Sequence, residues 1–476
     1  MADLSTLDAT AQAELVRSGQ ASAAELVDAA IERIEKVNGE LNAVILPLYE
    51  RARSAVEQGL PAGPFTGVPM VVKDLDGTLA GAPYHAGNIA LKNANYVADT
   101  TSHLFAKLQG AGFVIVGKTN TPEFGLMTTT ESVAYGPARN PWDVTRSTGG
   151  SSGGTGAAVA SGMVPLGHAG DGGGSIRIPA SMCGLFGLKP SRGRISLGPD
   201  ETEAWAGLVM RHVLTHTVRD SAAVLDVLQG YMTGDSYTAP PPARAYASEV
   251  GADPGQLRIG VRTTAPLGIA AVDPECVRAT EAAARTLESL GHTVEEASPA
   301  ALDDGALLEA FGNVMIADIR ADLLDVARIL GRDLTADDVE PGTWSSYENA
   351  AAFDAASYVA VLRKMHAWTR RMLAWWDDDR FDLLLTPTLG GVPPELGYLT
   401  DPAEGLGRML PYAIFTAPFN MTGQPAMSVP LASTASGLPV GVQLVAAAFR
   451  EDVLIRIAAQ LEQAQGWADR RPPLHA

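Results

Sequence analysis

Two serines lie beside glycine runs in one part of the chain. Ser151 is the third residue of Gly-Gly-Ser-Ser-Gly-Gly at 149–154, and Ser175 directly follows three glycines at 172–174. Glycine tolerates positive φ and lets a ligand approach the backbone closely, so these runs favour amide N–H groups aimed at an anion. A serine hydroxyl in that setting is a candidate nucleophile.

A serine nucleophile needs a base within hydrogen-bond reach, and histidine is the usual one. Ser175 lies in neither a Gly-x-Ser-x-Gly nor a Ser-x-x-Lys pattern. Residues 149–153 do spell Gly-x-Ser-x-Gly, but the preceding Thr-Arg-Ser-Thr at 145–148 is not the apolar strand that a nucleophile elbow requires. A lysine from elsewhere is the remaining candidate. It must be neutral to accept a proton, and burial favours the neutral form by lowering the pKa.

Lys73 ends a strand-like run at 67–72 and precedes the turn-forming pair Asp76-Gly77. Taken alone, this stretch favours a charge that reaches solvent where the strand stops, because lysine is seldom fully buried without a partner. The two serines give the same residue a second interpretation. A lysine that is buried at a strand end is a candidate base.

The 476-residue chain has a globular composition, with 46% hydrophobic and 19% charged residues. Its net charge of −19 disfavours a nucleic-acid partner, because phosphate neutralisation needs clustered Lys and Arg. Two cysteines and the single spaced pair His212 and His216 predict no metal, and we expect no other cofactor. The sequence shows neither a membrane-spanning run nor a signal-peptide pattern, so we expect a cytoplasmic protein with no membrane partner.

Helical and strand patterns alternate around the serines, which predicts an α/β fold with a sheet covered by helices. The clearest helix starts are Ser22 with Glu25, a capping box, and Asp273-Pro274, an N-cap followed by proline. Helices are expected at 8–18, 23–38, 102–110, 157–163, 221–229 and 273–291, within 307–379 and from 451. Strands are expected at 113–116, 257–261, 293–294, 381–385, 426–431 and 441–445.

A proline-rich stretch at 239–242 is a candidate domain boundary, but strand patterns continue on both sides of it. Strands from both ends of the chain can therefore join one sheet. We expect a single domain over 1–476, with a core at 65–225 and with the strands and helix of 381–465 completing the same sheet.

Several ordered motifs together resemble those of the amidase signature hydrolases. The matching pieces are 67–74, 149–154, 171–179 and 183–190, and similar stretches continue at 415–425 and 437–441. Within the family, 171–181 and 189–194 are most similar to the type of amidase that hydrolyses the cyclic dimer of 6-aminohexanoate, a nylon oligomer. The resemblance covers most of the chain. It implies one large domain with a mixed sheet and helices on both faces.

The resemblance also implies a Ser-cisSer-Lys triad. Ser175 matches the nucleophile that forms the acyl-enzyme, Ser151 matches the bridging serine at a cis peptide bond, and Lys73 matches the general base. The implied oxyanion hole consists of the backbone N–H groups of Gly172, Gly173, Gly174 and Ser175. Many relatives have Thr in place of Gly172, so this chain lacks one side chain beside the hole.

Other residues are expected to support this site. Asp171 and Arg177 flank the nucleophile, and the charged pair is expected to fix the loop rather than to do chemistry. Ser152 is either a support for the triad or a simple turn serine, and the sequence leaves both open. Met127 and Thr128 are expected to bind substrate. The pocket walls are expected in 199–215, 307–328 and 389–409.

The leading hypothesis is a serine hydrolase that cleaves C–N bonds of small linear or cyclic amides, anilides, or carbamates such as urethanes. The alternative is the glutaminase A subunit of a tRNA-dependent amidotransferase, which shares the core but works with partner subunits. A nucleotide-binding module is disfavoured because 149–156 lacks the Gly-Lys-Ser/Thr ending of a phosphate loop. We expect a small-molecule amide or carbamate as the ligand and a monomer or homodimer.

Overall fold

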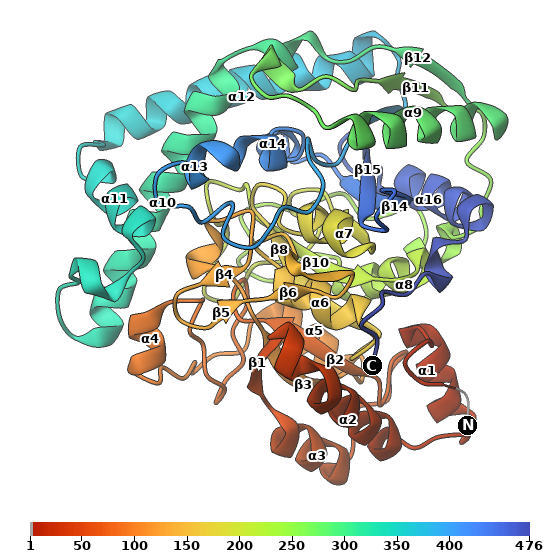
Figure 1. Ribbon diagram of the computed structural model, residues 1–476, viewed down its shortest axis with the longest axis vertical. Coiled ribbons are helices and arrows are strands. Elements are labelled where there is room, and N and C mark those ends of the chain that lie inside the picture. The colour runs from red at the N-terminus through yellow and green to blue at the C-terminus, as the bar shows by residue number, and fades with distance from the viewer. Residues whose placement is uncertain (1–2) are drawn as a thin grey trace.

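One eleven-stranded sheet runs through the computed structural model, which describes residues 3–476 (Figure 1). In spatial order its strands are β1 (Val44–Pro47), β3 (Val114–Thr119), β2 (Pro69–Lys73), β8 (Leu166–Asp171), β10 (Met210–Thr215), β9 (Phe186–Lys189), β14 (Ala426–Ser433), β15 (Pro439–Ala446), β13 (Leu383–Pro387), β11 (Arg258–Val261) and β12 (Thr293–Glu296). Both β3–β2–β8 and β13–β11–β12 are parallel, and the other neighbours are antiparallel. The sheet is therefore mixed, as predicted.

Helices cover both faces of the sheet, because alternate strand residues point to opposite sides. Leu383 and Leu385 pack into the core on one face, whereas Leu384 packs into the core on the other. The first face is covered by α1 (Ala9–Arg17), α5 (His103–Gly110), α8 (Val218–Leu228), α9 (Pro274–Ser289) and α16 (Glu451–Gln465). The second is covered by α2 (Ala23–Leu41), α3 (Tyr49–Gln58), α6 (Gly153–Ala160), α7 (Arg177–Cys183), α10 (Ala306–Leu330) and α12 (Ala355–Asp378).

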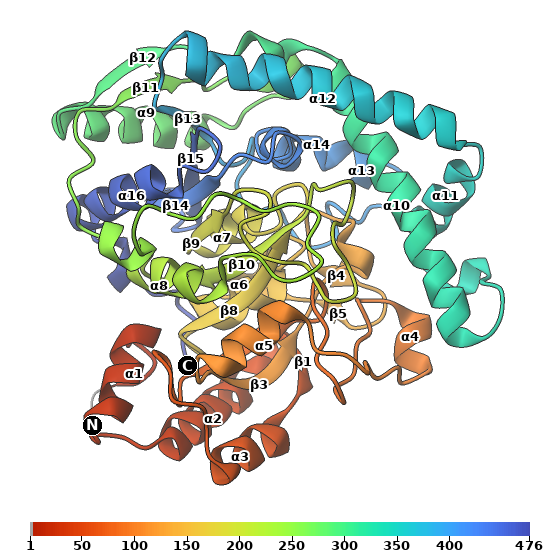
Figure 2. The same ribbon diagram turned by 180° about the vertical axis from the view of Figure 1, so that it is seen from behind.

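Helices α10, α11 (Pro341–Ala350) and α12 form an arm around one edge of the molecule, visible from both sides (Figures 1 and 2). Trp368, Trp375 and Trp376 of α12 are buried in the core on the second face. They pack the helix against this core. The remaining short helices are α4 (Ile89–Asn93), α13 (Gly405–Arg408), α14 (Leu410–Ala413) and α15 (Pro418–Met421).

Two helix starts follow the predicted caps. Ser22 accepts a hydrogen bond from the backbone N–H of Glu25 while the Glu25 side chain accepts one from the Ser22 backbone, which completes the capping box of α2. Asp273 caps α9, with Pro274 at its first position. The caps satisfy N–H groups that the first turn of a helix leaves without partners.

Strands from both halves of the chain share the sheet, because β14 pairs with β9 and β13 pairs with β11. The proline-rich stretch at 239–242 lies between α8 and β11, which contribute to the same core. It is not a domain boundary. The fold is a single domain, as predicted.

Three central strands, β8, β9 and β10, were not predicted. The segment 199–215, which we expected as a pocket wall, ends in the buried strand β10 (Met210–Thr215), between β8 and β9. β8 reads Leu-Gly-His-Ala-Gly-Asp, without the branched residues typical of strands. A Cβ at Gly167 would lie 2.6 Å from the Thr155 side chain of α6, so close helix packing accounts for a small residue there.

Candidate active site

Lys73 is fully buried at the end of β2, between β3 and β8. Its Nζ atom donates a hydrogen bond to Ser151 Oγ at 2.7 Å and lies 2.6 Å from Asp76 Oδ2. The interpretation of Lys73 as a solvated charge is therefore wrong. The strand end lies inside the molecule because strands flank it on both sides.

Burial lowers the pKa of the Lys73 ammonium group, although the nearby charge of Asp76 opposes this shift. A lower pKa enlarges the neutral fraction, which can accept a proton. Two other lysines, Lys118 and Lys189, are also fully buried. Lys118 pairs with Asp74, and Lys189 donates to backbone carbonyls, so these two have structural partners instead of a serine.

Ser151 lies between Lys73 and a cavity that Ser151 also lines. The cavity is open to solvent, since Asp200 and Glu201 of its lining are exposed. The peptide bond between Gly150 and Ser151 is cis. A Cβ at residue 150 would lie 2.6 Å from the backbone oxygens of Met127 and Thr129, so only glycine fits there. The Met127 backbone therefore lies beside the peptide bond that precedes Ser151.

Ser175 follows the β8 strand and precedes α7, and its side chain lines the same cavity as that of Ser151. Gly174 adopts φ +140°, and a Cβ there would lie 2.3 Å from Thr416 Oγ1. Within residues 3–476, the backbone N–H groups of 172–175 donate to no acceptor of the protein. Four unpaired amides beside a serine hydroxyl can receive a developing oxyanion.

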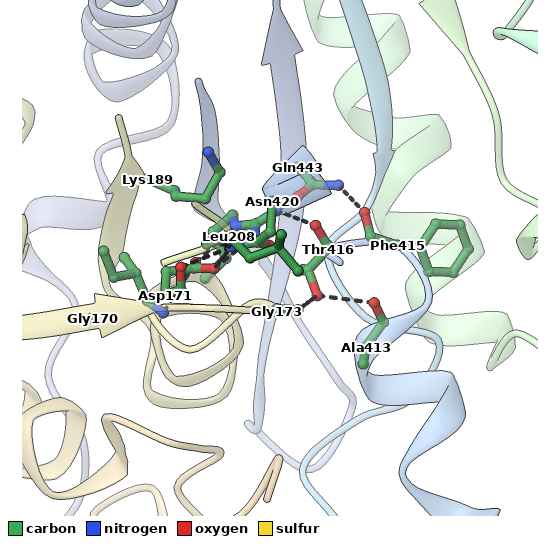
Figure 3. Close-up of polar contacts among 12 residues, drawn as sticks. Gly170, Asp171, Gly173, Lys189, Leu208, Ala413, Phe415, Thr416, Asn420 and Gln443 are labelled. Carbon is green, nitrogen blue, oxygen red and sulfur yellow. Dashed lines mark hydrogen bonds and ion pairs between the residues drawn. The ribbon is translucent and has the colours of Figure 1, made fainter. Parts of the chain in front are cut away.

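An ion pair under the loop holds it in place. Arg177 donates to both Asp171 carboxylate oxygens at 2.9 and 3.0 Å, and both side chains are fully buried. Figure 3 shows Asn420 beside Asp171, to which it donates two hydrogen bonds, and Thr416 donating to the Gly173 carbonyl at 2.6 Å. Burial opposes ionisation, but the charge of Arg177 lowers the pKa of Asp171 to about 2. The Asp171 carboxylate therefore stays ionised at neutral pH, and neither side chain lines the cavity.

Ser152 is fully buried and donates to the Gly170 carbonyl at 3.2 Å. Its hydroxyl thus ties the start of α6 to the end of β8. It does not line the cavity. Of the two interpretations of Ser152, this hydrogen bond favours a structural support over a simple turn residue.

Asp171→Asn is expected to destabilise the fold by about 3–5 kcal/mol, because it leaves the Arg177 charge buried without its partner. Chemical denaturation and the thermal midpoint measure the loss. Glu309→Gln is the matched control, since its ion pair with Lys364 lies on the surface and both side chains are more than half exposed. Equal midpoints for the two variants would show that the Asp171 pair does not hold the structure.

The cavity has a volume of about 360 Å³ and an acidic wall. Trp205 and Phe124 supply apolar surface, and Arg211 supplies a cation that is tied to Glu201 at 2.6 Å. Burial and the charges of Glu203 and Glu201 raise the pKa of Asp318 to about 6. The carboxylates in the lining are Asp76, Asp200, Glu201, Glu203, Asp318, Asp322 and Asp325.

The expected pocket walls contribute unequally. Residues 197–211 and 318–329 line the cavity, whereas 390–408 line a separate surface depression. Met127 and Thr128 are not among the lining side chains, so their contact with substrate stays a prediction. The indole of Trp205 lies against the loop, 3.1 Å from where a Cβ at Gly172 would be. It occupies the space that a side chain at position 172 would need.

Sequence reasoning missed Asp76, Trp205 and Arg211. Asp76 had a local signal, since it lies three residues after Lys73 in the same motif, but a turn explained it equally well. Trp205 and Arg211 lie in a segment without a recognisable motif. Among residues 3–476, no three His, Cys, Asp or Glu side chains are arranged to hold a metal ion. No helix in that part of the chain is long and apolar enough to cross a membrane.

The structure thus brings together, on a mixed α/β sheet, a cis-linked serine hydrogen-bonded to a buried lysine and a second serine beside free amides. The family model for amidases matches residues 25–455. The chain belongs to the amidase signature family and is a hydrolase that acts on amide bonds.

Among named proteins, the chain is 44% identical to the 6-aminohexanoate-cyclic-dimer hydrolase of Paenarthrobacter ureafaciens, over 98% of this chain and 96% of that protein. A putative amidase of Mycobacterium tuberculosis is 38% identical, over 99% and 97%. The solved structure of a 6-aminohexanoate cyclic dimer hydrolase superposes with a TM-score of 0.96 at 43% identity, covering 100% of both chains. A bacterial aryl acylamidase superposes with a TM-score of 0.88 at 29% identity, covering 98% and 99%.

Proposed function

We propose that this amidase hydrolyses small uncharged amides, with a cyclic amide such as the 6-aminohexanoate cyclic dimer as the first candidate substrate. The observation that carries the proposal is the 2.7 Å hydrogen bond from the buried Lys73 to Ser151, at the wall that also presents Ser175. The similarity to cyclic-dimer hydrolases over nearly the whole chain supports the substrate class. Anilides and carbamates present the same kind of carbonyl and are further candidates.

In the proposed mechanism, Ser175 Oγ attacks the substrate carbonyl carbon and gives its proton to Ser151. Ser151 passes its own proton to neutral Lys73, which becomes an ammonium ion. The backbone N–H groups of 172–175 stabilise the oxyanion, and losing one such donor typically costs about 2.7 to 4 kcal/mol. The C–N bond then breaks as the nitrogen takes the proton back from Lys73 through Ser151. Water cleaves the acyl-enzyme by the same relay and releases the acid.

The test is a substrate panel of linear amides, cyclic amides, anilides, carbamates and esters, assayed with the wild type and with Ser175→Ala. We expect wild-type turnover of at least one amide class and loss of that turnover in the variant. Glutamine hydrolysis that requires a partner subunit would instead support the amidotransferase alternative.

The acidic cavity is expected to discriminate against anionic substrates. A carboxylate on the acyl chain would lie beside a wall of seven carboxyl groups and one arginine. Raised pKa values of about 6 for Asp318 and about 7 for Asp322 leave these two partly protonated near neutral pH, but the wall keeps a net negative charge. We therefore expect kcat/KM to fall about 10-fold or more against a neutral analogue. Acyl p-nitroanilides that end in a methyl, a hydroxyl or a carboxylate group measure this, and the hydroxyl controls for polarity. The difference in kcat/KM between the carboxylate and the neutral substrates should become smaller at high salt, because ions screen the repulsion. Equal rates for all three substrates would contradict the prediction.

A further inference from the structure

We infer that Asp76 is a positioning residue for the proton relay: it holds Lys73 Nζ against Ser151 Oγ and stabilises the charge that Lys73 acquires when Ser175 attacks. The inference rests on the proposed mechanism. Its basis is the 2.6 Å contact between Asp76 Oδ2 and Lys73 Nζ, beside the 2.7 Å contact of the same Nζ with Ser151. The lysine therefore has one acidic partner and one relay partner at the same time.

The carboxylate of Asp76 lies in a niche formed by its own turn and by β8. Asp76 adopts φ +63° in the turn that follows β2. A Cβ at Gly170 would lie 2.1 Å from Asp76 Oδ2, so the absence of a side chain at 170 makes room for the carboxylate. The Gly170 carbonyl is in turn bonded to Ser152. Backbone conformation and a missing side chain thus set the position of Asp76 relative to Lys73.

Two other carboxylates near this pair already have ion-pair partners. Arg177 neutralises Asp171, and Glu201 pairs with Arg211. His168 is fully buried, and burial holds its pKa well below the usual range, so it is neutral. The titratable groups that face the pair from surrounding elements are His168, Asp171, Arg211, Tyr84 and Asp322. Within the described chain, Asp76 is the carboxylate in direct contact with Lys73.

The position of Asp76 gives it two opposing effects on the rate. An adjacent negative charge stabilises the lysine ammonium ion, so it favours the proton transfer that accompanies attack by the serine. The same charge raises the pKa of Lys73 in the free enzyme and so reduces the neutral fraction at low pH. Removing the charge should therefore lower the maximal rate and also move the acid limb of the pH profile to lower pH.

The experiment measures kcat/KM against pH for the wild type and Asp76→Asn, with an amide that the wild type hydrolyses. Asparagine keeps a hydrogen-bond acceptor and removes the charge. We expect the plateau to fall about 10- to 100-fold and the acid limb to move down by about one pH unit or more, the shift that a contacting opposite charge produces. A structural role alone would lower the plateau and leave the limb in place, and that result would overturn the inference.

Two further variants separate position from charge. Gly170→Ala keeps the Asp76 carboxylate but places a methyl group where its oxygen lies, so it should reproduce both effects of Asp76→Asn in folded protein. Asp322→Asn removes a cavity carboxylate that does not contact Lys73, and it should move the acid limb less than half as far. Equal shifts in Asp76→Asn and Asp322→Asn would overturn the inference, because the effect would then belong to the cavity as a whole.

Failure of the inference can be distinguished from failure of the proposed mechanism. If Ser175→Ala and Lys73→Met are inactive while Asp76→Asn keeps the wild-type limb, the mechanism stands and the role of Asp76 is wrong. If Ser175→Ala retains turnover, the mechanism itself is wrong. Circular dichroism and the thermal midpoint, measured on every variant, show which rates refer to folded protein.

Discussion

Ser175→Ala is expected to lower kcat by about 10⁴-fold or more, because the nucleophile acts as a unit with its base and no covalent intermediate forms without it. A serine-directed phosphonate should label the wild type once, on the peptide that contains Ser175, and should not label the variant. Mass spectrometry of the digested protein gives both results. The effect is large because the proposed relay starts at this single oxygen.

Ser181→Ala is the matched control for this experiment. Ser181 is a buried serine of α7, and its hydroxyl accepts a hydrogen bond from the Gly441 backbone at 2.9 Å, away from the cavity lining. We expect it to retain phosphonate labelling at Ser175. Labelling of Ser175→Ala on another serine, with turnover preserved, would assign the nucleophile elsewhere.

Lys73→Met is expected to lower kcat by about 10² to 10⁴-fold, the usual contribution of a general base. Methionine has a similar length to lysine but no basic group. The substitution therefore leaves Ser151 in the cavity lining and removes the group that accepts its proton. In the wild type, activity should fall as the pH is lowered through the pKa of Lys73. Since burial lowers that pKa, the fall should occur below the range of an ordinary lysine. Steady-state rates between acidic and alkaline pH measure both effects.

Lys118→Met is the control for loss of a buried lysine. Lys118 lies opposite Val72 on the neighbouring strand β3, is fully buried and pairs with Asp74 instead of a serine. The Lys118→Met variant should be less stable than the wild type, since Asp74 is left unpaired. Its rate per folded molecule should change less than about 10-fold. Equal losses of rate in the two variants, or a flat acid limb in the wild type, would contradict a lysine base.

The sequence predicted most strands of the sheet, but it missed the three adjacent strands β8, β10 and β9 and the edge strand β1. The helix cap at Ser22 and the continuous apolar run of β13 are strong local patterns, so the positions of these two elements were predicted closely. β8 has none, because residues such as Gly167 and Gly170 are determined by what packs against them: Thr155 in one case and Asp76 in the other. Such constraints exist only in the folded chain and leave no periodicity to recognise.

For the site, the sequence supplied the motifs and the structure supplied the contacts. Lys73 and Ser151 are 78 positions apart, yet they form a hydrogen bond. Their pairing was expected from the family resemblance and from the need for a base, whereas strand composition alone favoured a solvated lysine. The acidic wall was not anticipated, because Glu201 and Asp322 come from segments without motifs and meet only across the cavity.

The acidic wall also has a consequence for the end of the catalytic cycle. Hydrolysis of a neutral amide creates a carboxylate that the substrate did not have. The product is therefore repelled by the same side chains that accept the uncharged starting material. For a linear amide, whose amine leaves as a separate molecule, the cavity therefore favours departure of the acid over its return, and accumulating acid should compete weakly with fresh substrate.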